Sequence, residues 1–184
     1  MNEEILSLFN DIINLEEIEL ADIPMIDLYM DQVITLFENK LEKGKRSSKD
    51  KLLTKTMINN YVKGKVLMPA KNKRYTPGHM IMMALIYHLK QTLSIGDIKA
   101  LFTETVYKEE VDLPTLYNRF IDIKKRDQAQ GEKVITEKLE ALNPDQSDRI
   151  DILMMVLSLV SSANMHKQLA EKLIDNYLID PDKT

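Results

Sequence analysis

Apolar residues recur at spacings of three and four along most of the chain, which is the period of helices with one buried face. No stretch shows the sustained alternation of a half-exposed strand. We therefore predict an all-α protein. The expected helices cover residues 2–18, 24–41, 55–63, 77–91, 95–103, 113–142 and 148–178. The sixth is either continuous or broken within the polar stretch 124–133.

Local signals set the ends of the third expected helix. Thr54 is a good N-cap for it, and Gly64 stands where a left-handed residue would stop it. Pro69 makes the following residues extended, and residues 70–75 form a short basic segment with the character of a hairpin. Either Ser147 or Asp148 can cap the last helix.

Two segments are apolar on nearly every side. Residues 80–86 predict a central, buried helix, whereas residues 152–157 need cover on two sides, from their own core and from a partner subunit. The Met-rich C-terminal half could also hold a hydrophobic small-molecule effector, although core filling is the more ordinary role of Met. We expect a homodimer, with residues 113–142 as the second choice of contact. The favoured dimerisation residues are Leu153, Val156, Leu157 and Val160.

The composition narrows the chemistry. The 184 residues include no Cys and three His, so disulfides, thiol catalysis and thiolate zinc sites are excluded. His79 and His88, nine residues apart on one helix, fall on opposite faces. No glycine-rich phosphate loop or nucleophile motif is present, and we expect no enzyme, metal or cofactor. The longest apolar run is too short for a membrane span, and the acidic N-terminus does not resemble a secretory signal, so we expect a cytoplasmic protein.

The net charge of −4 conceals a partition along the chain. Residues 1–39 carry −10, residues 40–74 carry +10, and residues 75–184 carry −4. A strongly basic block inside an acidic protein indicates a surface for a polyanion. The alternative is that its lysines only solvate two loops, as charge runs usually do.

Three short motifs follow one another in and after the basic block, and their order resembles that of a known protein family. The stretch KVLMP at 65–69 precedes KRYT at 73–76, and SIGDI follows at 94–98. This order resembles the DNA-binding half of MerR-like winged helix-turn-helix regulators over about 50 residues, with another 30 upstream. The loop before Thr54 is longer than an ordinary helix-turn-helix turn, and Asn59-Asn60-Tyr61 replaces the Arg-Tyr-Tyr common in those regulators. The whole chain also resembles an uncharacterised bacterial family, domain of unknown function number 1836.

The resemblance implies a winged helix-turn-helix over residues 24–103, preceded by an acidic N-terminal helix at 1–23. Residues 104–184 would form a helical oligomerisation or effector region. The implied function is a transcription regulator that binds double-stranded DNA. The implied DNA-binding residues are Lys55, Thr56, Asn59, Asn60, Tyr61, Lys63, Lys71, Lys73, Arg74 and Tyr75.

A second hypothesis keeps the helical fold without DNA binding. The chain would then be a protein–protein interaction module, and the acidic first 39 residues would shield the basic block or repel DNA. In that case Asn59 and Asn60 only cap and solvate a helix end. Under either hypothesis, Tyr61 and Tyr75 suit the core or an anchor for the wing better than base stacking.

Overall fold

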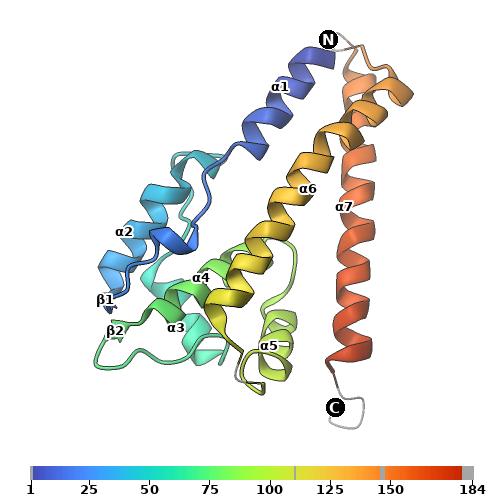
Figure 1. Ribbon diagram of the computed structural model, residues 1–184. Coiled ribbons are helices and arrows are strands. Elements are labelled where there is room, and N and C mark those ends of the chain that lie inside the picture. Colours follow the sequence, from blue (N-terminus) through green and yellow to red (C-terminus); the bar gives the residue numbers. More distant parts are fainter. Residues whose placement is uncertain (1, 110, 146–147, 180–184) are drawn as a thin grey trace. The chain divides into compact units, whose positions relative to one another are not determined.

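The computed structural model describes residues 2–109, 111–145 and 148–179 (Figure 1). It is mostly helical with one small antiparallel sheet, which confirms the all-α expectation at the level of fold class. The helices are α1 (Asn2–Ile13), α2 (Met30–Leu41), α3 (Lys55–Lys63), α4 (Pro77–Leu89), α5 (Ile95–Glu104), α6 (Leu113–Leu142) and α7 (Arg149–Tyr177). The strands are β1 (Leu28–Tyr29) and β2 (Arg74–Tyr75), and 3-10 turns cover Leu20–Asp22 and Glu42–Gly44. None of the helices in these ranges has the length and apolar character needed to cross a bilayer.

The chain divides into two compact units. The larger contains residues 16–121 and 171–184, and the smaller contains residues 1–15 and 122–170. Helices α6 and α7 each contribute to both units. The continuous course of α6 settles the question of a break at 124–133.

The core of the larger unit is built around α4. Every residue from His79 to Ile86 on this helix is buried, as its all-round apolar sequence predicts. Phe37 of α2, Ile58 of α3 and Ile98 of α5 are buried in the same cluster. The unit is therefore a set of amphipathic helices packed on one wholly apolar helix.

This buried cluster extends beyond the predicted range 24–103. Ile18 on one side and Tyr117 on the other belong to it. The Tyr117 hydroxyl donates a hydrogen bond of 2.5 Å to the Ile18 carbonyl, across 99 positions of sequence. Segments that flank the predicted domain thus complete its core.

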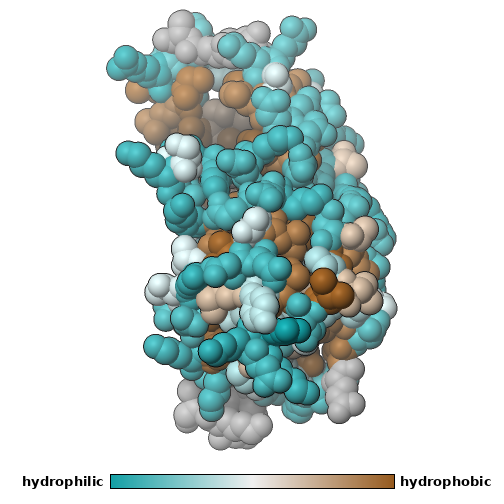
Figure 2. All heavy atoms as spheres, turned by 90° about the vertical axis from the view of Figure 1, so that its left-hand side faces the viewer, coloured by the Kyte–Doolittle hydropathy of each residue, from teal (hydrophilic) through white to brown (hydrophobic). Residues whose placement is uncertain are grey.

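The first two helices differ from expectation. Helix α1 ends at Ile13 rather than residue 18, because Ile18 leaves the helical path and enters the core of the larger unit. Helix α2 begins at Met30 rather than residue 24, because Leu28 and Tyr29 adopt extended backbone and pair with β2. Met25, Ile26 and Tyr29 are consequently exposed. Figure 2 faces the side of β1 and α2 and shows hydrophobic surface among mostly hydrophilic side chains.

In the smaller unit, α1 packs along α6. The Gln128 side chain donates to the Ile13 carbonyl (3.1 Å), and the Phe9 ring lies against Gly131. Helix α7 begins after Asp148, whose Oδ1 accepts the Ile150 N–H at 2.7 Å. Asp148 therefore acts as the expected cap, and the other candidate, Ser147, lies outside the described residues.

Candidate nucleic-acid interface

Helix α3 presents one buried and one exposed face. It begins after Thr54, whose Oγ1 accepts the Met57 N–H at 3.1 Å, as the sequence predicts. Ile58 and Tyr61 are buried on the inner side. Five of the predicted DNA-binding residues share an arc of about 140° on the outer side, at about 100° per residue. These exposed residues are Lys55, Thr56, Asn59, Asn60 and Lys63.

The end of α3 differs from the expectation that Gly64 is the left-handed residue that stops the helix. Gly64 has a right-handed φ of −73°, and the left-handed residue is Lys65, with φ 59°. The Lys65 N–H bonds to the Val62 carbonyl and the Val66 N–H to the Tyr61 carbonyl, which closes the last turn. A Cβ at position 64 would lie 3.1 Å from the Asn60 carbonyl oxygen. Glycine is therefore used here for close approach, and Lys65 turns outward as an exposed side chain.

The basic segment after Pro69 forms a tight hairpin. Lys71 and Arg74 exchange two backbone hydrogen bonds of 2.9 and 3.1 Å. Between them Asn72 and Lys73 have φ values of 50° and 62°. Positive φ at both central positions is the pattern of a type I′ turn, whose twist suits a two-residue hairpin. The hairpin-like interpretation of residues 70–75 is thus confirmed, with its tip at Asn72 and Lys73.

The base of this hairpin is fixed at two points. Strand β2 pairs antiparallel with β1, with Leu28 opposite Tyr75 and Tyr29 opposite Arg74. The Arg74 guanidinium lies over the Tyr29 ring, 5.1 Å from its centroid, and donates to the Tyr29 hydroxyl at 3.2 Å. Below the hairpin, the buried His79 Nε2 lies 3.2 Å from the Pro69 carbonyl oxygen. Both anchors hold the segment on the larger unit.

Two predicted DNA-binding residues lie inside the core. Tyr61 and Tyr75 are buried, and burial raises the pKa of both phenols. The Tyr75 ring contacts the His79 ring edge to face, with centroids 5.6 Å apart. This is the packing position that the sequence favoured for them. The buried Tyr61 side chain packs α3 against the core, and the buried Tyr75 side chain does the same for the hairpin.

Acidic residues pair with the first part of the basic block. The Lys43 hydrogen bond lowers the pKa of Glu16, and the Asp22 hydrogen bond raises the pKa of Lys40. The four ion pairs are Lys40–Asp22 (2.6 Å), Lys43–Glu16 (2.6 Å), Lys45–Glu38 and Lys55–Asp31 (2.7 Å). The acidic segment thus neutralises part of the block, on lysines up to position 55.

The second part of the block keeps its charge. Lys63, Lys65, Lys71 and Lys73 are exposed, and none of them forms an ion pair with another described residue. Arg74 contacts an aromatic ring rather than a carboxylate. Among the described residues of the block, positive charge without an ion pair therefore lies at the end of α3 and on the hairpin, and also at the exposed Arg46 and Lys49 in the loop before α3.

The described residues offer little that meets the requirements of a metal site or of a reactive side-chain pair. No three His, Asp or Glu residues within them are placed to hold a metal ion. His88 and Glu17 lie 3.3 Å apart, both largely buried, with the His88 ring between Tyr87 and Phe120. These groups lie among packed aromatic rings and suit a structural role.

Sequence reasoning missed two residues that build the interface. The Tyr29 ring packs against the Arg74 guanidinium, and His79 Nε2 lies within hydrogen-bond distance of the Pro69 carbonyl oxygen. A two-residue strand is too short to show alternation, so Tyr29 gave no signal of its own. His79 did carry a signal, because it stands three residues after the Thr76 cap, where a side-chain acceptor completes a capping box.

The fold and the site define a mostly helical protein with a small two-stranded sheet, an exposed basic face on α3 and an exposed basic hairpin. A family model described as Domain of unknown function (DUF1836) matches residues 18–120, more than half of the chain. The chain belongs to this family, as one of the two resemblances predicted. Searches of curated proteins and of solved structures find no match to the chain.

Proposed function

We propose that the protein is a DNA-binding transcription regulator of the MerR-like winged helix-turn-helix type. The observation that carries the proposal is the pairing of α3 with a type I′ hairpin, both exposed and both bearing lysines without carboxylate partners among the described residues. Cations without such partners favour phosphate binding, because no internal ion pair must first be broken.

The residues of α3 would read the major groove. Asn59 and Asn60 carry amides that can pair bidentately with adenine, while Lys55, Thr56 and Lys63 can contact phosphate. On the hairpin, Lys71, Lys73 and Arg74 would follow the neighbouring backbone or minor groove. In this proposal Tyr61 and Tyr75 position the two elements through the core and do not touch DNA.

The long loop between α2 and α3 is compatible with a rigid helix pair. Glu38 on α2 pairs with Lys45 and accepts the Leu52 N–H at 3.2 Å, so one carboxylate joins both ends of the loop. Leu52 and Leu53 are buried just before the Thr54 cap. These contacts would restrain the loop, and with it the start of α3, in spite of the length of the loop.

Salt dependence provides the test. We expect purified protein to bind random duplex DNA at low salt, with affinity that falls steeply as salt rises. Lys71→Ala combined with Lys73→Gly removes two charges, and glycine retains the positive φ that the hairpin tip needs. The slope of log K against log salt should become shallower by about 1.8. Lys99→Ala with Lys108→Ala, two exposed lysines outside the interface, should leave the slope unchanged.

Base reading has a separate expectation. In a binding-site selection from random duplexes, Asn59→Ala with Asn60→Ala should lose sequence preference and keep the salt slope, since amides carry no charge. No binding at low salt, or an equal slope in the hairpin and control variants, would remove the DNA hypothesis.

The second candidate function is a protein-interaction module. The Lys55–Asp31 pair favours it, because an acid from α2 neutralises a lysine on the proposed reading face. The substitution Asp31→Asn distinguishes the DNA-binding proposal from the protein-interaction proposal. If the surface binds DNA, this variant should bind several-fold more tightly at low salt, because a repelling charge is gone. If neither protein binds DNA, the interaction module is the better proposal.

A further inference from the structure

Helix α7 carries an uncharged surface that the chain leaves open. Residues 152–165 form a run of fourteen residues without a charged side chain. Most of them are exposed, and among the described residues of this run only Met155 is buried. An exposed helix of a water-soluble domain normally carries charges on its outer face, so this run calls for a covering partner.

The smaller unit has little core of its own. Within its described residues, the buried hydrophobic side chains are Leu139 and Met155. Fifteen large hydrophobic residues of the same unit are each more than a third exposed, ten of them on α7. Two buried side chains give far too little apolar burial for an independently stable unit.

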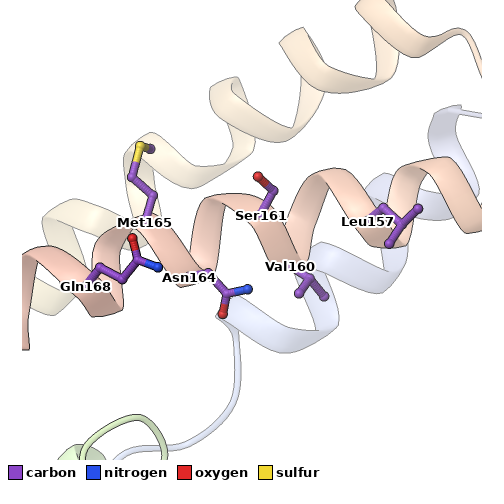
Figure 3. Close-up of a pocket in the computed structure, with 6 residues that line it drawn as sticks. All are labelled: Leu157, Val160, Ser161, Asn164, Met165 and Gln168. Carbon is purple, nitrogen blue, oxygen red and sulfur yellow. The ribbon is translucent and has the colours of Figure 1, made fainter.

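Part of this surface has the spacing of a helix–helix contact. Ile150, Leu153, Leu157, Val160 and Asn164 follow one another in steps of three, four, three and four, the heptad pattern of paired helices. The four apolar members are 48–62% exposed. Figure 3 shows Val160 and Asn164 pointing to the same side of α7. An open hollow of about 420 Å³ is lined by Leu157, Val160, Ser161, Asn164, Met165 and Gln168, all on α7.

The side of α7 that meets α6 is different. There Met155 is buried, and Ser158 accepts a hydrogen bond of 3.0 Å from Lys138 of α6. The contacts that the structure shows on this side include one Met and one small polar residue, whereas Leu153, Leu157 and Val160 are about half exposed. The heptad stripe is thus not part of the internal packing of the unit.

We propose that this stripe of α7 binds the same stripe of a second copy of the chain. A two-fold contact places identical surfaces together, and an uncharged, apolar stripe is complementary to itself. The residues flanking its middle and C-terminal part, Met154, Val156 and Ala163, are also uncharged, so no like charges would meet there. This inference does not depend on DNA binding.

The available area fits a dimer. The exposed apolar residues of α7 within about 100° of Leu157 present roughly 370 Å² of apolar surface per copy, taking about 100 Å² for a whole aliphatic side chain. They are Ile150, Leu153, Met154, Val156, Leu157, Val160 and Met165. A standard interface buries about 800 Å² on each partner, somewhat more than half of it apolar. Covering this side of α7 would therefore supply most of the apolar area of an interface of ordinary size.

The test is the molar mass in solution, measured by sedimentation velocity over a range of protein concentrations. The full-length protein should sediment at twice the chain mass of 21.3 kDa. Leu157→Glu places two carboxylates in the contact and should weaken the dimer on the order of a hundredfold or more. Leu157→Ala, which adds no charge, should weaken it about tenfold and guards against a folding defect.

Leu169→Glu is the matched control. Leu169 is also exposed on α7 but lies more than 100° around the helix from Leu157 at about 100° per residue. This variant should remain dimeric. A full-length protein that stays at 21.3 kDa at every concentration would overturn the proposal. So would equal dissociation of the Leu157 and Leu169 variants, or a monomer that binds phospholipid vesicles through α7.

Discussion

Among single residues, His79 contacts several groups at the base of the hairpin. Its Nδ1 lies 3.1 Å from the Thr76 backbone N and accepts that N–H, while Nε2 faces the Pro69 carbonyl. A carbonyl can only accept, so the neutral ring carries its proton on Nε2. The side chain joins the N-terminus of α4 to the segment that leads into the hairpin. This pairing explains how an imidazole is tolerated in the core.

Replacing this imidazole tests its role. We expect His79→Ala to lower the free energy of unfolding by about 2–3 kcal/mol, because two backbone groups lose their partners and a cavity forms. Urea denaturation measures the loss. His166→Ala, at an exposed histidine, should change the free energy of unfolding by less than about 0.5 kcal/mol. Equal effects of the two substitutions would contradict the role given to His79.

At the scale of elements, the contact between α1 and α6 depends on Gly131. A Cβ at this position would lie 2.7 Å from Cζ of Phe9, closer than any ordinary contact. Glycine inside a helix costs about 1 kcal/mol in helix propensity relative to alanine. Its presence in the middle of α6 is therefore explained by the ring that lies against it.

A larger residue at this position should loosen α1. We expect Gly131→Val to displace the Phe9 ring and speed hydrogen exchange of the α1 amides, with little effect on α4 in the larger unit. Adding Phe9→Ala should remove the steric conflict, so the double variant should lose less stability than the sum of the two single losses. Additive losses would show that the two residues do not conflict.

At the scale of the whole molecule, ionisable groups whose pKa values shift on folding set the pH range of stability. Burial raises the pKa of five tyrosines, which favours the neutral phenol in the folded state. Their contribution is complete below the unfolded value of about 10 and falls as pH rises above it. Lys90 opposes this in part, since burial lowers its pKa. The five tyrosines are Tyr61, Tyr75, Tyr87, Tyr107 and Tyr117.

At low pH, stability changes with pH in the opposite direction and falls as the pH falls. The Lys43 hydrogen bond lowers the pKa of Glu16, and hydrogen bonds to Asp22 and Glu38 outweigh the effect of burial and lower theirs. Stability from these carboxylates is present above their unfolded pKa of about 4 and is lost as pH falls below it.

The pH profile of unfolding checks both limits. We expect the urea midpoint to be highest between about pH 5 and 10 and to fall on either side. The part of the tyrosinate absorbance that belongs to these five phenols should rise together with unfolding rather than before it, because burial disfavours their ionisation. Full ionisation of the tyrosines in a protein that remains folded would contradict the burial assigned to them.

Much of the element pattern could be predicted from the sequence. The caps at Thr54 and Thr76 and the buried course of α4 follow from residues only a few positions apart. The hairpin tip at Asn72 is equally local. In the candidate site, the exposed face of α3 could be predicted because helix geometry alone places its residues on one side.

The sequence by itself determined the helical class, the helix caps, the segregation of charge and the uncharged run of α7, because each depends on composition or on neighbours within a turn or two. Tertiary structure decided which lysines of the basic block are paired with acids. It also decided that Leu28 and Tyr29 form a strand and that Tyr117 bonds to Ile18. These contacts join distant segments, and only the folded chain fixes which segments meet.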